Sequence, residues 1–259
     1  MLVEMENVEK KLNVIAKNTN PKQSFLLTFT GKGASQEQVF EPEISISDGC
    51  HYEIAFTSLD TSYSMPNIDL SNNTFQVGRI DTPLTEITVD PGCYGMMHLN
   101  KEILRLLESL GMPKAVKFTA NYNTFKCNMI ISPGYVVNFT EHSMRRVFGF
   151  KAGKYEAATQ KRFVSDSNVQ ILPINSILVQ CNLVGQSYLN GVLAPIVHTF
   201  FLPKADPGEK IIETPVEYIY LPVSSDVIRR ISVWLTDQNG DLLNLTNEAV
   251  TIRFHLRSC

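Results

Sequence analysis

The stretch RISVWLTDQNG at residues 230–240 contains a strand pattern followed directly by a turn signal. Ile231, Val233 and Leu235 alternate with other residue types, and a period of two places these three side chains on one face of a strand. The Asn-Gly pair that closes the stretch is typical of a tight turn between antiparallel strands. We therefore expect a half-buried strand that ends in a hairpin turn.

The same alternation recurs along the chain. Asn123 and Thr124 lie between two alternating runs and predict a second hairpin. Successive strands without a helix between each pair favour antiparallel sheets over parallel βαβ units. The chain is therefore predicted to be all-β, an antiparallel sandwich or jelly roll. Further alternating runs cover residues 25–29, 52–57, 86–89, 116–120, 177–183 and 251–256.

Helical patterns are confined to two short internal segments. Apolar residues recur at helical spacing over residues 99–110, with Asn100 as the expected N-cap and Gly111 at the end. A second short helix is expected over residues 141–148. Because no shift in composition marks a boundary, residues 24–259 are expected to form one domain.

The first 23 residues have a different pattern. Val8, Leu12 and Ile15 recur at helical spacing among Glu and Lys. A helix this short is marginal by itself, so residues 1–23 are expected to form an amphipathic arm that needs a partner surface. The segment lacks the apolar region of a secretory signal, and no run approaches the roughly 20 residues of a membrane span. We therefore expect a protein made inside the cell and not secreted.

Composition narrows the class of protein further. Hydrophobic residues make up 44% of the chain and charged residues 19%, which is typical of a globular protein. With 23 basic and 26 acidic residues the net charge is −3, which disfavours a general nucleic-acid binder. The five cysteines are odd in number and form no CxxC pair, so reduced thiols are expected.

No motif for catalysis or cofactor binding stands out. Glycine-rich phosphate loops and the HExxH and GxSxG signatures do not occur. Residues 237–248 place acidic side chains at several positions of a calcium loop, but Leu242 occupies the position that needs glycine. Cys93 precedes a helix, where the pKa of a thiol can be lowered, yet no His signature accompanies it. We expect no catalytic residue, no metal site and no cofactor.

Residues 141–162 form the most basic stretch of the chain and also contain Phe148, Phe150 and Tyr155. A solvated surface is one interpretation. Because basic residues mixed with aromatics bind single-stranded nucleic acid, a weak contact with a packaged genome is the other. The candidate residues for that contact are Arg145, Arg146, Lys151 and Lys154.

The single tryptophan, Trp234, is out of phase with the aliphatic residues of its strand and is expected on the opposite face. It either packs beneath a loop or anchors a contact between subunits, because tryptophan is enriched in interface hot spots.

Seven short stretches, taken in order, resemble the minor capsid (penton) protein of Polinton (Maverick) elements and adintovirus-like viruses. The resemblance runs from about residue 35 to the last residue, and it is carried by the order and spacing of structural motifs. The polar residues 152–162 have no match in the family pattern. The stretches are FEPEISI (40–46), YEIAF (52–56), SMPNI (64–68), GQSYLNG (185–191), EYIYLPV (217–223), DQNG (237–240) and IRFHL (252–256).

This resemblance implies a single jelly-roll domain that acts as a structural protein of a virion. Five copies would form the capsomer at each five-fold vertex, beside a double jelly-roll major capsid protein. A closed ring of this kind uses a heterologous contact, in which one flank of each copy meets a different flank of the next.

Two other classes of function also suit a β-sandwich, because one fold hosts many functions. A non-enzymatic binding module, lectin-like or fibre-head, would carry an aromatic-rich patch on loops. An enzyme on a jelly-roll scaffold, as in the cupins, would need a His/Glu metal cluster, of which His51 and Glu53 supply only a fragment. We expect a structural protein and not an enzyme.

Overall fold

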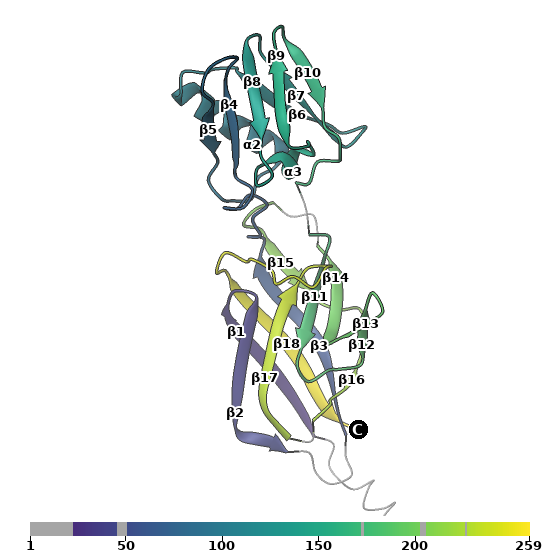
Figure 1. Ribbon diagram of the computed structural model, residues 1–259. Coiled ribbons are helices and arrows are strands. Elements are labelled where there is room, and N and C mark those ends of the chain that lie inside the picture. Colours follow the sequence, from purple (N-terminus) through teal and green to yellow (C-terminus); the bar gives the residue numbers. More distant parts are fainter. Residues whose placement is uncertain (1–22, 46–50, 172–173, 203–205, 226) are drawn as a thin grey trace, which may run out of the picture. The chain divides into compact units, whose positions relative to one another are not determined.

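The computed structural model describes residues 23–45, 51–171, 174–202, 206–225 and 227–259 (Figure 1). The chain divides into two compact units. Unit 1 combines residues up to Tyr63 with Ile174–Cys259, and unit 2 is the continuous segment Ser64–Pro173. Antiparallel strands dominate both units, which confirms the all-β prediction. The expected arm, residues 1–23, lies outside the described residues except for Gln23.

Unit 1 contains two antiparallel sheets and a separate hairpin. The β1 sheet has the order β1-β18-β3-β15, with the short β16 also paired to β3, and the β2 sheet has the order β14-β11-β17-β2. The hairpin consists of β12 and β13. The strands are β1 (Ser24–Lys32), β2 (Ser35–Ser45), β3 (Tyr52–Ser62), β11 (Ser176–Cys181), β12 (Ser187–Leu189), β13 (Val192–Ala194), β14 (Ile196–Phe201), β15 (Lys210–Glu213), β16 (Leu221–Pro222), β17 (Val227–Thr236) and β18 (Ala249–Ser258).

The core of unit 1 lies between its two sheets and is rich in aromatic rings. Phe254 on β18 meets Phe29 and Phe56 edge-on, with ring centroids 5.8 and 6.1 Å apart. Phe56 on β3 also stacks on His198 of β14, in the other sheet, at 4.5 Å. The inward side chains are the aliphatic and aromatic residues of the alternating patterns, so period two accounts for the buried face.

Both junctions with unit 2 lie at the same end of the unit 1 sandwich. The chain leaves after Tyr63, whose N–H bonds to the carbonyl of Glu209, and returns before Asn175, whose carbonyl accepts from Leu202. Leu202 follows β14 and Glu209 precedes β15, so these groups share one end of the unit. Ser24 opposite Arg257 marks the other end.

Unit 2 is a second antiparallel structure with its own sheets, ordered β10-β7-β6 and β5-β4-β8-β9. The predicted hairpin at residues 123–124 is confirmed, because it joins β6 to β7. The elements are β4 (Thr74–Arg79), β5 (Thr85–Thr88), α2 (Met96–Ser109), β6 (Val116–Asn121), β7 (Lys126–Ile131), β8 (Tyr135–Phe139), α3 (Arg145–Phe148), β9 (Gly153–Ala157) and β10 (Lys161–Val164).

A cluster of phenylalanines forms the centre of unit 2. Phe118 and Phe148 stack at 4.1 Å with nearly parallel rings, and Phe75 meets Phe118 edge-on at 5.9 Å. Helix α2 covers this core with its apolar face, including Leu99 and Ile103, which are fully buried. The separate core explains why the expected single domain divides in two.

The two helices differ from their predicted bounds. Helix α2 begins one turn earlier than expected, with Gly95 as its N-cap. Asn100 is not the cap, because its side-chain oxygen accepts a hydrogen bond from the Phe118 N–H of β6 at 2.7 Å and so ties helix to sheet. Helix α3 is a single turn, shorter than the predicted 141–148.

Because both junctions share one end of the sandwich, unit 2 should be removable. Replacing residues 64–173 by a short Gly/Ser linker is expected to leave unit 1 folded, since insertions are tolerated where their ends lie together. Far-UV circular dichroism and a cooperative thermal transition measure this. A control deletion of residues 64–181, which also removes β11, is expected to abolish that transition. An unfolded or aggregated first variant would contradict the division into units.

Candidate functional site

Two of the predicted basic residues are neutralised by neighbouring carboxylates within unit 2. Arg145 forms an ion pair with Glu141, four residues earlier in the chain. Lys151 lies 3.4 Å from the Asp166 carboxylate, which also accepts a hydrogen bond from the Lys151 backbone N–H. Arg146 and Lys154 are exposed. The stretch therefore offers fewer free positive charges than its sequence indicates.

The aromatic residues of the same stretch are not available to stack on bases. Phe148 and Phe150 are buried in the core of unit 2. Tyr155 is half-buried, and its hydroxyl donates to the Lys151 carbonyl. Because stacking on nucleic acid requires an exposed ring, the structure corrects the view of these residues as part of a binding surface. The genome contact remains a hypothesis carried by Arg146 and Lys154.

Trp234 lies on β17 with its side chain on the face opposite Ile231 and Val233, as the phase of the pattern predicted. The indole is half-buried, and its N–H donates to the side-chain oxygen of Gln180 at 3.1 Å. Gln180 in turn donates to Thr236 at 2.7 Å. The polar atom of the tryptophan is therefore satisfied within unit 1, and a role in a subunit contact stays a prediction.

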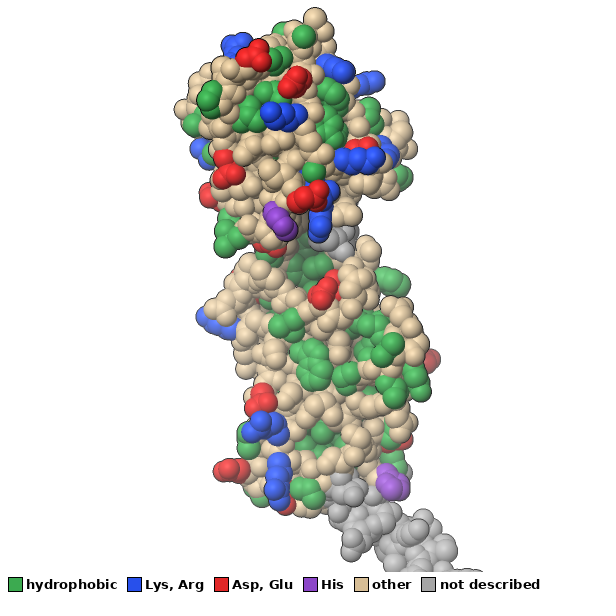
Figure 2. Space-filling model, in the orientation of Figure 1, with side chains coloured by type: hydrophobic (Ala, Val, Ile, Leu, Met, Phe, Trp, Pro, Cys, Tyr) green, Lys and Arg blue, Asp and Glu red, His purple; other side chains and the backbone are tan. Residues whose placement is uncertain are grey.

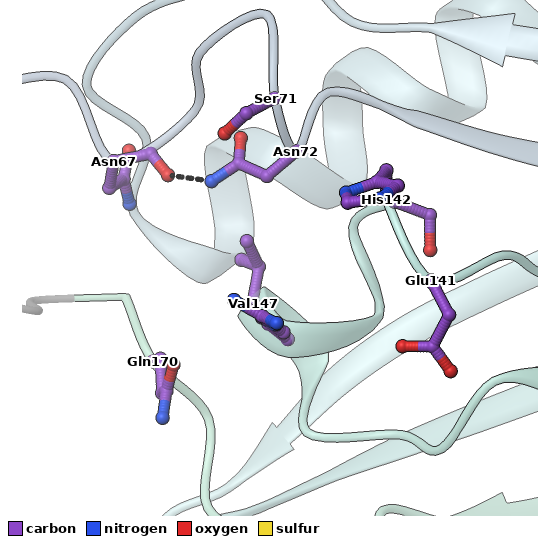
Figure 3. Close-up of a pocket in the computed structure, with 9 residues that line it drawn as sticks. Asn67, Ser71, Asn72, Glu141, His142, Val147 and Gln170 are labelled. Carbon is purple, nitrogen blue, oxygen red and sulfur yellow. Dashed lines mark hydrogen bonds between the residues drawn. The ribbon is translucent and has the colours of Figure 1, made fainter.

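A polar cavity of about 290 Å³ lies in unit 2 (Figure 3). It is bordered by the loop that precedes β4 and by α3 with the residues before it. Of the predicted site residues it includes only Arg146. The lining residues are Asn67, Ser71, Asn72, Glu141, His142, Ser143, Arg146, Val147 and Gln170.

Asn67 organises one wall of this cavity. Its side-chain nitrogen donates to the carbonyls of Tyr94 and Ile171 at 2.7 and 2.8 Å, and its side-chain oxygen accepts from the Tyr94 N–H at 2.8 Å. Its own carbonyl accepts from Asn72, the bond drawn in Figure 3. These bonds join three separate segments of unit 2, so Asn67 is a structural residue of the motif SMPNI.

An apolar groove of about 390 Å³ lies elsewhere in unit 2, beside the β6–β7 hairpin. Tyr122 is 80% exposed and Phe125 68% exposed. Met96, Val169 and Ile171 line the groove with them. An aromatic patch on a hairpin loop is the feature that a binding module would show. The alternating pattern predicted the hairpin, but the groove depends on segments that are distant in sequence.

The candidates for metal or thiol chemistry have structural roles. Cys93 donates its S–H to the Met65 carbonyl, and burial raises the pKa of its thiol, which is opposite to the activation that catalysis needs. Glu53 pairs with Arg257 at 3.0 Å. The carboxylate of Asp237 accepts two backbone N–H bonds inside its turn, and an isolated bridge between Thr236 and Leu242 closes that turn. The predicted hairpin is wrong, because β17 and the next strand, β18, lie in different sheets. Among the described residues, no group of three or more His, Cys, Asp or Glu side chains is placed to hold a metal ion.

Neither helix of the described part of the chain has the length and apolar character needed to span a membrane.

The solved structures that the chain resembles include a viral penton protein. No protein-family model matches the chain, and no curated protein matches it. The crystal structure of the mavirus penton protein superposes with a TM-score of 0.47 at 14% sequence identity, over 92% of this chain and 100% of that one. The function proposed below rests on the chain's own strand order and sequence motifs.

Removal of the Asn67 side chain tests its role in the cavity wall. Asn67→Ala is expected to lower the free energy of unfolding of unit 2 by about 2–3 kcal/mol, because it leaves buried backbone groups without partners. Gln170→Ala, at the same cavity but exposed, is expected to change it by less than about 0.5 kcal/mol. Scanning calorimetry measures both. Equal, small effects would show that the Asn67 bonds contribute little.

Proposed function

We propose that the chain is a minor capsid (penton) protein, of which five copies form the capsomer at the five-fold vertex of an icosahedral virion. The fold in this proposal is supported by the order in which the strands of unit 1 pair. Apart from the two-residue β16, which also pairs with β3, the strands of its two main sheets are, along the chain, β1, β2, β3, β11, β14, β15, β17 and β18.

These strands pair in the manner of a long hairpin folded back on itself. The first pairs with the last (β1 with β18) and the second with the last but one (β2 with β17). The third and sixth pair as β3 with β15, and the fourth and fifth as β11 with β14. All four pairs are antiparallel. This scheme is the one expected of a jelly roll, the fold of many capsid proteins and also of lectins and cupins.

The fold alone does not choose among those functions, so the sequence motifs carry the choice. The stretches that resemble penton proteins are structural elements of unit 1 in several cases. YEIAF lies in β3, IRFHL lies in β18, and DQNG is the turn that follows β17. In the proposed capsomer, unit 2 is an insertion between the third and fourth strands of the jelly roll.

The two flanks of unit 1 suit a ring with a heterologous contact. The edge strands β1 and β2 end the two sheets on one flank, and β15 and β14 end them on the other. Each flank exposes different side chains, so one flank of a copy can meet the other flank of the next, which is the geometry that closes a cyclic ring. A double jelly-roll major capsid protein is the proposed partner around that ring.

The solution mass of the purified full chain tests the proposal. A species close to 5 × 29.1 kDa is expected by light scattering or mass photometry, with or without the major capsid protein. A chain that stays monomeric in both cases contradicts the capsomer. If that monomer binds a glycan through the Tyr122 and Phe125 groove, the lectin-like alternative replaces the proposal.

The arm gives a second test. Deleting residues 1–22 is expected to leave both units folded, because their cores lie in the described residues, and to weaken assembly. The fraction of pentamer at fixed protein concentration measures this. Loss of soluble protein would show that the arm belongs to the fold, and unchanged assembly would show that it contacts no neighbour.

A further inference from the structure

Unit 2 differs from the rest of the chain in charge. Its residues 64–173 include 12 Lys and Arg against 9 Asp and Glu, a net charge of +3, whereas the whole chain has a net charge of −3. Figure 2 shows Lys and Arg side chains at the margin of unit 2 where Figure 1 draws β10. Because a local excess of positive charge attracts anionic partners, the placement of these cations indicates where such a partner binds.

The outer face of the β10-β7-β6 sheet carries cations and no acid. Directly paired residues of antiparallel strands share a face, and the register places Lys117 and Arg162 on either side of Ile130. Residues that alternate with these, such as Phe118 and Met129, are buried in the core of unit 2, so the face with Lys117 is the solvent side. Its residues are Lys117, Thr119 and Asn121 of β6, Lys126, Asn128 and Ile130 of β7, and Arg162 and Val164 of β10.

The charges that border this face do not cancel its cations. Asp166 lies two residues beyond β10, and its carboxylate pairs with Lys151 at 3.4 Å. The ammonium of Lys126 donates to the backbone carbonyl of Asp166 and not to its carboxylate. Helix α2, tied to β6 through Asn100, contains two acidic and two basic residues and so adds no net charge. The outer face therefore keeps its positive charge.

Exposed aromatic rings lie at one end of the same face. The apolar groove beside the β6–β7 hairpin is lined by Tyr122 and Phe125, and also by Asn121, which lies opposite Lys126 in the sheet. The groove and the cationic face therefore meet at the Asn121–Lys126 pair. The carbonyl of Phe125 accepts a hydrogen bond from the Val169 N–H at 2.9 Å, which fixes the backbone that carries this ring.

Cations beside exposed rings suit one class of partner. Single-stranded nucleic acid carries a negative charge on each phosphate and presents unpaired planar bases, and proteins bind it through a cationic surface with aromatic side chains on which the bases stack. A double strand keeps the faces of its bases inside the helix, and a sulfated polysaccharide has anions but no planar rings. Neither of these two polymers would use the aromatic residues of the groove.

We propose that the outer face of the β10-β7-β6 sheet and the adjoining groove bind single-stranded nucleic acid. Lys117, Lys126 and Arg162 contact the phosphates, and Tyr122 and Phe125 stack on bases. The proposal concerns unit 2 alone and does not depend on the capsomer.

This surface differs from the basic stretch at residues 141–162, of which only Arg162 belongs to it. Lys154 lies on β9, in the other sheet of unit 2. The aromatic residues of that stretch are buried or half-buried, whereas Tyr122 is 80% exposed and Phe125 is 68% exposed. The rings that can stack on bases are therefore those of the hairpin.

Neutralising the three cations gives the first test. Lys117→Gln, Lys126→Gln and Arg162→Gln together are expected to raise the dissociation constant for a fluorescein-labelled oligothymidylate by about 10-fold or more at about 50 mM salt. Because each phosphate contact with a single strand contributes about 0.7 to the slope of log K against log salt, the slope is expected to fall by about 2. Fluorescence anisotropy with the full chain measures both quantities.

The matched control removes the same charge from unit 1. Lys32→Gln, Arg229→Gln and Arg253→Gln are exposed positions outside the proposed surface, and their combination is expected to leave the dissociation constant nearly unchanged. Circular dichroism checks the fold of both variants.

The aromatic residues give a test of base recognition. Tyr122→Ala with Phe125→Asn is expected to raise the dissociation constant for the oligothymidylate by about 10-fold or more, because two stacking platforms are lost. Asparagine is chosen because residue 125 has a φ of 56°, which asparagine tolerates. The same variant is expected to bind heparin as the wild type does, since heparin has no bases to stack.

Three results would overturn the proposal. The first is a wild-type chain that does not bind the oligothymidylate at about 50 mM salt. The second is binding that survives both sets of substitutions and is lost in Arg146→Gln with Lys154→Gln, which would place the contact on α3 and β9. The third is binding of heparin and oligothymidylate with equal affinity, unchanged by the aromatic substitutions, which would indicate a site for polyanions in general.

The solution mass separates this surface from the capsomer. A wild-type pentamer that binds no nucleic acid overturns the proposed surface and leaves the capsomer standing. A wild-type monomer that binds the oligothymidylate through these residues supports the surface and contradicts the capsomer.

Discussion

The pairing of β1 with β18 is the constraint on which unit 1 depends. It joins residues 24–32 to residues 249–257, the most distant segments that the structure describes. Without this pairing β18 would have one neighbouring strand fewer and β1 would pair with no strand. Phe254 would also lose its contact with Phe29 of β1. Closing so long a loop costs only slightly more entropy than closing a shorter one, and the packing of two sheets offsets that cost.

The sequence predicts strands well where one face of the strand is buried and the other is exposed to solvent. Alternation located β1, β3, β17 and β18, and gave the correct face for Trp234. β8 was not predicted as a strand, because both of its faces are buried and its hydrophobic residues do not alternate with polar ones. β2 was not predicted, because it is an edge strand and none of its residues is fully buried. The division into two units could not be predicted from the amino-acid composition, because the cores of both units contain the same kinds of residue.

The candidate surfaces were less predictable than the strands. Charge at Lys151 is visible in the sequence, but its pairing with Asp166 is known only from the fold. Asn67 gave no signal, because its partners are backbone groups of other segments. An interface consists of side chains that remain exposed after folding, and the hydrophobic pattern of the sequence does not show which side chains these are.

The insertion of unit 2 also fixes an order of events during synthesis. Residues 64–173 are continuous and contain a whole core, so unit 2 can fold as soon as it has left the ribosome. β1, β2 and β3 emerge earlier, yet their partners β18, β17 and β15 are translated only afterwards. The nascent chain therefore carries open strand edges for the time needed to make more than half of the protein. Such edges are sites of aggregation.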